Sequence, residues 1–322
     1  MIGKRAKIFI LFYLAGLFVL FLMCSTDLII REPEKEVYEI AVIIEDVGDD
    51  NYSNFRKGMD QAAIEYNADV HFITLYEKLD EMQQMELISR EEQDGVDALI
   101  VAPVDEERFG GALLEKQTAV PVVLLSTGIA QEKMAGKVIV DYWKMGEMLS
   151  EKMAEKIPEN CPVVLLTESG SEEPMSDDFL EGAKEVLKES GHVLQTAEPD
   201  EEEGYQKLFE ESFENRPALL AANPEILAEM AGILAGNPEY AEQIVGLYGR
   251  GNTQEIWNDL DRELIAGICV TDEFGRGYFS VYMAVQALEG KEVKEPLIME
   301  SYYIEKKDLR KPEYEKILFP ME

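Results

Sequence analysis

Small polar residues follow two buried runs in the first half of the sequence, and they are the first candidates for binding chemistry. Residues 98–102 and 120–125 are apolar throughout, which is typical of parallel strands that helices cover on both faces. Asp105 follows the first run, and Ser126 and Thr127 follow the second. Ligands of open α/β sheets bind at the carboxyl ends of the strands. We therefore expect these carboxylate and hydroxyl groups to hydrogen-bond a small ligand.

The sequence lacks the residue patterns of common catalytic centres. It has no Gly-x-Ser-x-Gly elbow, no phosphate-loop lysine, and no histidine suited to activate a serine or cysteine. His71 and His192 are its only histidines, and its cysteines show no metal-ligand spacing. The glycine spacing at 246–251 is wrong for a dinucleotide-binding loop, so an ordinary turn is expected there. We predict no catalytic residue, no metal site and no cofactor.

Strand and helix patterns alternate over most of the 322 residues. Further apolar runs predict strands at 40–44, 70–75, 138–140, 163–166, 218–222, 244–247 and 265–270. Apolar residues three and four positions apart predict helices at 54–66, 83–93, 145–156, 178–190, 225–234 and 275–288. This number of elements exceeds one sheet of ordinary size. The predicted fold class is therefore α/β, with two doubly wound, Rossmann-like lobes.

The N-terminal residues form a different kind of segment. Lys4, Arg5 and Lys7 precede an apolar run at 8–23 that contains no charge. Extended to residue 30, this run approaches the roughly 20 residues that span a bilayer. Basic residues at its start keep that end in the cytoplasm. We expect residues 8–30 to form one transmembrane helix in the lipid bilayer of the cell membrane, with the remaining chain extracytoplasmic.

Three outcomes are open for this segment. A signal peptidase needs small residues one and three positions before its cut, and no nearby pair fits. Cys24 could accept a lipid, but Met23 before it is bulkier than such a site requires. A signal anchor at 1–31, followed by a linker at 32–37, is therefore preferred over a lipoprotein or a cleaved signal peptide.

The chain is strongly acidic, with 30 Lys and Arg against 65 Asp and Glu and a net charge of −35. Nucleic-acid binding depends on basic groups that displace condensed counterions. Nucleic acid is therefore excluded as a partner. A heavily solvated surface that resists aggregation is the simplest explanation of the acidity.

Short segments in a particular order follow the N-terminal segment. They are 40–52, 55–63, 95–105, 120–125, 140–142 with Gly146, 178–182, 221–223, 244–246, and 271–274 before Gly277. In order and spacing they resemble the type I periplasmic sugar-binding proteins, which include ribose- and galactose-binding members. Repressors of this fold carry a helix-turn-helix segment before the domain, whereas this chain has a membrane segment there. The repressor function is therefore excluded.

The resemblance implies two lobes that are joined by a three-strand hinge and trap a small polar ligand as they close. The crossings fall near 140–141, 270–271 and 299–301. The N-terminal lobe is then 38–140 plus 272–298, and the C-terminal lobe is 141–271 plus 299–322.

Loop, strand-end and hinge positions supply the candidate ligand-binding residues. They are Asn51, Tyr52, Asp105, Ser126, Thr127, Asp141, Tyr142, Asn223, Tyr248 and Thr271. The tyrosines among them could form platforms for a sugar ring or another flat ligand.

The candidate site departs from the sugar-binding pattern at several positions. Ser126 and Thr127 stand where an acidic residue is typical, and 175–177 contains no arginine where one is typical. Tyr248 replaces an aspartate and Thr271 replaces a glutamine. Charge-assisted hydrogen bonds are about twice as strong as neutral ones, so these losses make a pentose ligand less expected.

Most of these candidates also have a structural explanation. Turn formation accounts for Asn51 and Tyr52 as well as ligand contact does. Asp105 and Asn223 are suited to cap helices. Tyr142 can serve as a packing residue at the hinge. Both explanations stay open for these residues.

Two functional classes agree with these features. The first is a tethered solute-binding protein that delivers a sugar or sugar-like molecule to a membrane permease for ABC-type import. The second is a ligand-sensing protein that signals to a membrane histidine kinase or another signalling partner. An enzyme on this fold is not expected, because the catalytic patterns are missing.

Overall fold

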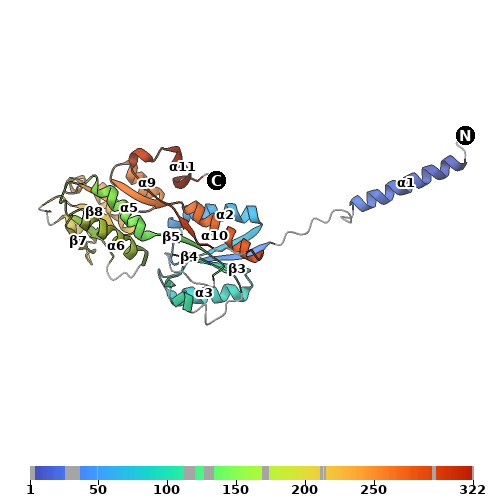
Figure 1. Ribbon diagram of the computed structural model, residues 1–322, viewed down its shortest axis with the longest axis horizontal. Coiled ribbons are helices and arrows are strands. Elements are labelled where there is room, and N and C mark those ends of the chain that lie inside the picture. Colours follow the sequence, from blue (N-terminus) through green and yellow to red (C-terminus); the bar gives the residue numbers. More distant parts are fainter. Residues whose placement is uncertain are drawn as a thin grey trace. The chain divides into compact units, whose positions relative to one another are not determined.

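In the computed structural model the chain divides into two units, Met1–Val37 and Tyr38–Glu322 (Figure 1). The structure describes residues 4–25, 37–48, 50–106, 108–111, 120–126, 134–168, 174–210, 213, 215–291 and 295–320. Within these ranges the second unit contains two six-stranded sheets with helices on their faces. Each sheet forms the centre of one lobe.

The described residues of the first unit form helix α1, Lys4–Ser25. Its large apolar side chains, such as those of Phe9 and Phe12, are exposed. Across the described ranges of the chain, no helix is both long and apolar enough to cross a membrane. The predicted transmembrane helix at 8–30 is therefore not supported by the structure. Residues 26–30 of that segment lie outside the described residues.

The first sheet of the second unit is parallel, with strand order β11-β5-β4-β3-β1-β2. Its strands are β1 Tyr38–Ile43, β2 Ala68–Ile73, β3 Ala98–Val101, β4 Val122–Ser126, β5 Gly136–Val140 and β11 Leu297–Met299. All five apolar runs predicted before residue 141 lie in this sheet, and their ends shift by one or two residues.

Helices cover both faces of this sheet, which explains why its central strands are apolar throughout. The helices are α2 Ser53–Tyr66, α3 Glu81–Asp94 and α10 Glu273–Leu288. Ile40 packs in one cluster with Phe55 of α2 and Val281 of α10. Ile43 points to the opposite face and packs with Leu87 of α3. Figure 1 shows α2 and α10 on one side of the strands and α3 on the other.

The second sheet has the order β12-β10-β9-β8-β6-β7, with only β12 antiparallel to its neighbour. Its strands are β6 Val163–Leu166, β7 Leu194–Ala197, β8 Ala218–Ala221, β9 Gly246–Arg250, β10 Gly267–Thr271 and β12 Ser301–Ile304. Strand β7 is not among the predicted strands. It lies at the edge of the sheet with Gln195 and Thr196 exposed, so it lacks an apolar run.

The remaining helices belong mostly to the second lobe. They are α5 Tyr142–Ala154, α6 Pro174–Glu189, α7 Pro224–Gly236, α8 Pro238–Ala241, α9 Gln254–Asp261 and α11 Pro312–Leu318, with short 3₁₀ turns η1 Asp50–Tyr52, η2 Tyr205–Phe209 and η3 Lys306–Asp308. Helices α5 and α6 pack on each other, and α7 packs on β8, β9 and α9.

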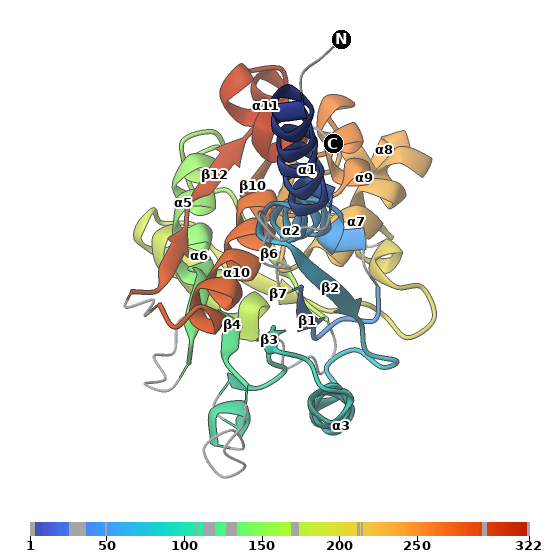
Figure 2. The same ribbon diagram turned by 90° about the vertical axis from the view of Figure 1, so that its right-hand side faces the viewer.

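The chain passes between the two sheets at three places. Strand β5 of the first sheet leads through Asp141 into α5, which packs on β9, β10 and β12. Strand β10 of the second sheet leads through Asp272 into α10, which packs on β3, β4 and β5. Strand β11 leads through Glu300 into β12, which lies beside β10 (Figure 2). The second unit is thus a two-lobed α/β fold. The exact lobe limits stay a prediction.

Candidate functional site

A cavity of about 90 Å³ lies where the carboxyl ends of strands from both sheets meet. Its lining comes from the segments after β1 and β2, the ends of β9 and β10 with the residues after β9, and the first turns of four helices. The lining residues are Glu45, Asp46, Asn51, Tyr52, Lys78, Tyr142, Met145, Met175, Pro224, Glu225, Arg250, Gly251, Asn252, Cys269, Val270, Thr271, Glu273 and Arg276. Because this is the edge at which open α/β sheets bind ligands, the cavity is the candidate site.

The first lobe contributes a buried carboxylate and a tyrosine that bonds to it. Glu45 follows β1, and Tyr52 precedes α2; both are at least nine-tenths buried. The Tyr52 hydroxyl donates to both carboxylate oxygens of Glu45, at 2.8 and 2.9 Å. Burial raises the pKa of Glu45 above its usual range, and burial together with the neighbouring Glu45 raises the pKa of Tyr52 well above 10. Tyr52 therefore stays protonated and acts as the donor.

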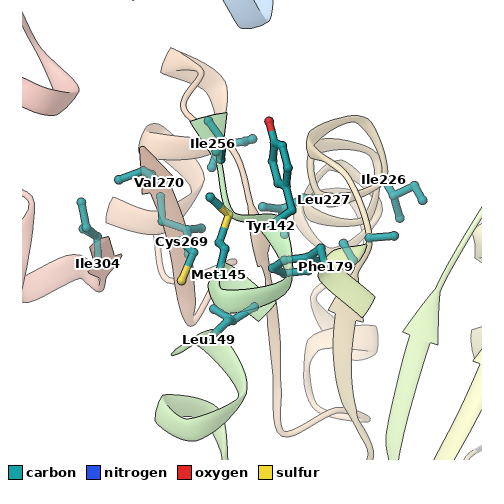
Figure 3. Close-up of a cluster of buried hydrophobic side chains, with 14 of the residues drawn as sticks. Tyr142, Met145, Leu149, Phe179, Ile226, Leu227, Ile256, Cys269, Val270 and Ile304 are labelled. Atoms are coloured by element: carbon teal, nitrogen blue, oxygen red, sulfur yellow. The ribbon is translucent and has the colours of Figure 1, made fainter. Parts of the chain in front are cut away.

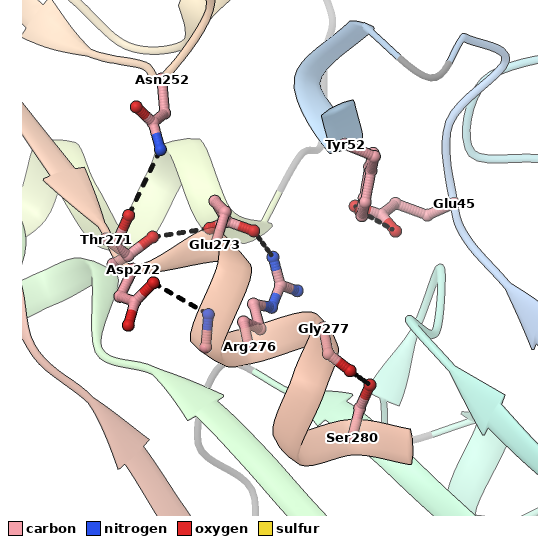
Figure 4. Close-up of polar contacts among 10 residues, drawn as sticks. Glu45, Tyr52, Asn252, Thr271, Asp272, Glu273, Arg276, Gly277 and Ser280 are labelled. Atoms are coloured by element: carbon pink, nitrogen blue, oxygen red, sulfur yellow. Dashed lines mark hydrogen bonds and ion pairs between the residues drawn. The ribbon is translucent and has the colours of Figure 1, made fainter. Parts of the chain in front are cut away.

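A second carboxylate connects the hinge to a buried arginine (Figure 4). The Thr271 hydroxyl, at the end of β10, donates to Oε1 of Glu273 at 2.6 Å. Nη1 of Arg276 donates to Oε2 of Glu273 at 3.2 Å. Burial by itself lowers the pKa of Arg276, but Glu273 and the tyrosines around the cavity raise it above its ordinary value. Arg276 is therefore a permanent positive charge at the wall of the cavity.

The second lobe contributes Arg250, the last residue of β9, which is buried. Its Nε donates to the carbonyl oxygen of Ala222 at 3.0 Å, and one Nη donates to the Ser176 hydroxyl at 3.2 Å. Its guanidinium carbon lies 4.9 Å from the ring centre of Tyr142, close enough for a cation–π interaction. Ser176 belongs to segment 175–177, where the family typically has an arginine. Here Arg250 of β9 contacts this segment instead.

Apolar side chains of the second lobe support this wall from behind. Met145 and Leu149 of α5 pack with Phe179 of α6 and Val270 of β10. Figure 3 shows the hydroxyl end of Tyr142 pointing away from Leu149 and Phe179. Burial raises the pKa of Tyr142, so its hydroxyl remains a donor. The ring is fixed by this packing, and its polar end is part of the cavity lining.

One hydrogen bond joins the two lobes at the edge of the cavity. Nδ2 of Asn51, in the segment after β1, donates to Oε1 of Glu225 in the first turn of α7 at 2.7 Å. Both residues line the cavity. The contact brings together residues 174 positions apart in the sequence. The lobes are therefore in contact on the ligand side of the hinge.

Four of the predicted site residues lie at this cavity. They are Asn51, Tyr52, Tyr142 and Thr271. Asn51 and Tyr52 lie between β1 and α2, Tyr142 is the first residue of α5, and Thr271 ends β10. All are near the carboxyl ends of strands, as the carboxyl-edge argument predicted. Their contact with a ligand stays a prediction.

Three other predicted residues bond to the backbone of nearby helical turns and are not part of the cavity lining. The carboxylate of Asp105 accepts from the Arg108 N–H, and that of Asp141 accepts from the Lys144 N–H. Asn223 accepts from the Ile226 N–H and donates through Nδ2 to Glu168 at 2.9 Å. All three therefore cap helical turns, a role that the sequence left open for Asp105 and Asn223. A ligand role for the three stays a prediction.

The last three predicted residues lie elsewhere. Tyr248 is buried in β9, where burial, followed by the charge of Glu305, raises its pKa to about 12; it does not line the cavity. Ser126 ends β4, and its side chain is outside the described part of the structure. Thr127 lies outside the described residues.

Four buried charged residues at the cavity were missed by the sequence interpretation: Glu45, Arg250, Glu273 and Arg276. Glu45 and Arg250 are charged residues at the ends of apolar runs, and this signal could have identified them. The pattern was obscured by the many acidic residues and by the glycines around Arg250. Arg276 gives no such signal, because it lies inside a helix. Within the described ranges no group of three or more potential metal ligands occurs.

Two α/β lobes joined by three crossings, with a small cavity between them that contains buried charged side chains, define a class of ligand-binding proteins. The sequence profile of the family described as periplasmic binding protein domain matches residues 40–292. The chain therefore belongs to the periplasmic binding protein family, which confirms the resemblance found in the sequence. Among curated proteins, no match to this chain is found.

Solved structures share this fold at low sequence identity. A glucose-galactose binding protein from Geobacillus stearothermophilus has 20% identity and a TM-score of 0.73, covering 86% of this chain and 100% of that chain. A carbohydrate transporter solute-binding protein from Agrobacterium radiobacter, in complex with D-arabinose, has 15% identity and a TM-score of 0.77, with 88% and 99% covered. An ABC transporter solute-binding protein from Bacillus halodurans, with bound myo-inositol, has 21% identity and a TM-score of 0.71, with 88% and 99% covered.

Proposed function

We propose that this protein is an extracytoplasmic solute-binding protein that traps one small, uncharged, hydroxyl-rich molecule, a sugar or a cyclic polyol, between its lobes. The main support is the composition of the cavity wall. Its buried charged residues are Glu45, Glu273, Arg250 and Arg276, two acidic and two basic. A neutral ligand fits this balance, because a charged ligand would bury a charge without a partner, which costs free energy.

The same residues are suited to hydroxyl groups. A carboxylate accepts a hydrogen bond from a ligand hydroxyl and a guanidinium donates one, and such charge-assisted bonds are the strong ones. The rings of Tyr52 and Tyr142 add flat surfaces for the apolar face of a sugar. Solved relatives of the same fold contain D-arabinose and myo-inositol, which are ligands of this chemical type.

A thermal-shift and calorimetric screen tests this proposal on the full chain in detergent. We expect at least one of D-galactose, D-arabinose, D-allose and myo-inositol to raise the melting temperature, because a ligand that binds only the folded state stabilises it by mass action. D-galacturonate and D-galactose 6-phosphate are charged controls of matched shape and should bind more weakly than D-galactose. Binding of the charged compounds alone would contradict the proposal.

The second part of the proposal is a role in ABC-type import, in which a membrane permease receives the ligand. Membership in the periplasmic binding protein family supports a binding role rather than catalysis. Cells that lack the protein should take up the radiolabelled sugar identified in the screen more slowly, and the cloned gene should restore uptake. Unchanged uptake at sugar concentrations near the dissociation constant would rule out this role.

We also propose that the first unit holds the binding unit at the cell membrane. Three basic residues, Lys4, Arg5 and Lys7, precede sixteen residues without charge in the sequence, at 8–23. Intact-mass measurement of the native protein should find these residues still attached. A mature chain that starts after residue 24, or a lipid on Cys24, would contradict the proposed anchor.

A further inference from the structure

Arg276 is the one side chain at the cavity with a buried nitrogen that lacks a hydrogen-bond partner among the described residues. Its side chain is 7% exposed, and its Nε has no partner there. Nη1 is used by Glu273, at 3.2 Å. The guanidinium carbon lies 5.9 Å from the centre of the Phe55 ring, so this ring covers part of the group without accepting its Nε–H.

A buried guanidinium N–H without a partner is unfavourable, because the group has lost its bonds to water and gained none. Buried polar groups in folded proteins nearly always have a partner, so this exception needs an explanation. Arg276 lines the cavity, as do Glu45 and Tyr52. Because the nitrogen itself has almost no accessible surface, a small rotation of the side chain would be needed to bring its N–H to a ligand in the cavity.

The chemistry of the acceptor follows from the neighbours of Arg276. Glu273 already balances its charge, and Arg250 and Glu45 add one further buried charge of each sign to the cavity wall. A carboxylate or phosphate on the ligand would add an uncompensated negative charge beside Glu45 and Glu273. A neutral hydroxyl oxygen accepts the bond without this penalty.

We infer that Arg276 is a specificity-determining residue, whose Nε–H donates to one hydroxyl oxygen of the bound sugar or polyol. This inference rests on the proposed function and names one contact within it. Arg276 lies in α10, just after the β10–α10 crossing. The sequence analysis instead expected the ligand-binding residues on loops, at strand ends and at the first residues of the hinge. The contact thus links one ligand hydroxyl directly to the Thr271–Glu273–Arg276 chain at the β10–α10 crossing.

Calorimetric titration of the full chain in detergent tests the contact. The probes are D-galactose, D-arabinose and myo-inositol, each with its monodeoxy analogues. In the wild type, removal of one particular hydroxyl should weaken binding roughly ten- to a hundredfold. In Arg276→Lys the parent sugar should be weakened by a similar factor, and removal of the same hydroxyl should then have little further effect.

The control is Arg262→Lys. Arg262 also forms an ion pair with an acidic residue three positions away, Asp259 at 3.1 Å, but its side chain is 59% exposed and it does not line the cavity. Its affinities should equal those of the wild type. Arg276→Gln is a second variant in case the lysine variant does not fold, which urea unfolding will show.

The unmutated protein provides an independent measurement. In protein labelled with ¹⁵N-arginine, the Nε–H signal of Arg276 should move and exchange more slowly with water when the sugar is added. Two results would overturn the inference while leaving sugar binding intact. One is that each deoxy analogue loses the same affinity in the wild type as in the Arg276 variants. The other is an Nε–H signal that does not move. If the wild type binds none of the four compounds in the screen for the proposed function, that function fails and the inference fails with it.

Discussion

At the scale of single residues, the site depends on buried charges that are held by short hydrogen bonds. Removing one partner of a buried ionic contact leaves the other unpaired, which destabilises the fold more than losing both together. Glu45 illustrates this, because the Tyr52 hydroxyl is the side-chain donor that holds both of its carboxylate oxygens. The pair orients the first-lobe wall of the cavity before any ligand arrives.

Tyr52→Phe should lower the free energy of unfolding by about 1 to 3 kcal/mol, because a buried carboxylate loses its donor. Burial raises the pKa of Glu45, and the Tyr52 bond opposes this rise by favouring the charged form. Loss of the bond raises the pKa of Glu45 further in the variant. The loss of stability should therefore be full above the variant's pKa and should shrink as the pH falls from there to the wild-type pKa, both of which lie above 4.5. Urea unfolding at a series of pH values measures it.

Tyr76→Phe is the control for this prediction, because Tyr76 is 81% exposed. It should unfold like the wild type at each pH. A Tyr52→Phe loss that grows as the pH falls would mean that the hydroxyl bonds the protonated carboxyl instead.

At the scale of elements, each lobe contains a helix pair that packs through glycines. A Cβ added at Gly58 or Gly277, between α2 and α10, would lie 1.9 or 2.0 Å from a backbone oxygen of the facing helix. Gly146 and Gly182, between α5 and α6, show distances of 1.9 and 2.0 Å. These four glycines are among the segments that resemble the family. Their physical role is to let the two helix backbones approach.

Gly146→Ala should therefore destabilise the protein by about 1 to 3 kcal/mol or more, since α5 and α6 must separate to admit the methyl group. Gly232→Ala is the matched control, because a Cβ there, inside α7, meets nothing within 4 Å. It should stabilise the protein by up to about 1 kcal/mol through helix propensity. Urea unfolding should show opposite signs for the two changes; equal signs would contradict the packing argument.

Helix caps explain why several strand-end residues are polar. Asp141→Ala should lower the free energy of unfolding by about 0.5 to 2 kcal/mol, because the N–H of Lys144 loses its acceptor. Asp141→Ser should restore most of this loss, since serine also caps helices. Urea unfolding and sugar titration should be measured together. Weak binding by a stable Asp141→Ser variant would show that the carboxylate contacts the ligand, as the sequence predicted.

At the scale of the whole molecule, contacts between the lobes border the ligand site. Asn51 bonds Glu225 at the cavity edge. Asn54 of α2 donates to the carbonyl oxygen of Leu318 at 3.2 Å, at the end of α11, where Phe319 packs on Trp257 of α9. The C-terminal segment therefore bridges from the second lobe to a helix of the first. An opening of the lobes on the cavity side would break the Asn51–Glu225 bond.

Asn51→Asp should shift the lobes towards an open arrangement, because it places a second carboxylate against Glu225. Like charges at about 4 Å repel by about 1 kcal/mol in water and more when partly buried, so sugar affinity should fall roughly fivefold or more. Dyes on Ile64→Cys and Val193→Cys, exposed positions in different lobes, report the inter-lobe distance by fluorescence energy transfer.

Asn258→Asp makes the same charge change at an exposed position on α9 and serves as the control for this experiment. It should leave the distance and the affinity unchanged. High salt should partly reverse the effect of Asn51→Asp, because ions screen the repulsion. An unchanged distance in Asn51→Asp would mean that the Asn51–Glu225 bond does not hold the lobes together.

The sequence by itself determined the two sheets and the edge at which the candidate cavity lies. Continuous apolar runs require helices on both faces, and parallel strands bring their carboxyl ends to one edge, whatever the details of packing. Asn51, Tyr52, Tyr142 and Thr271 reached the cavity for this reason. Strand β7 was missed because an exposed edge strand needs no apolar run.

Only the tertiary structure decided which charges meet. Glu45 and Arg276 are 231 positions apart, and a single sequence contains no information on which side chains face each other across such a distance. Asp141 and Asn223 show the same limit, because a polar residue after a strand can bond either a ligand or the next helix, and local geometry made both of them caps. The position of Arg276 inside α10 gave no local signal, since its role depends on the hinge that folds this helix against the first lobe.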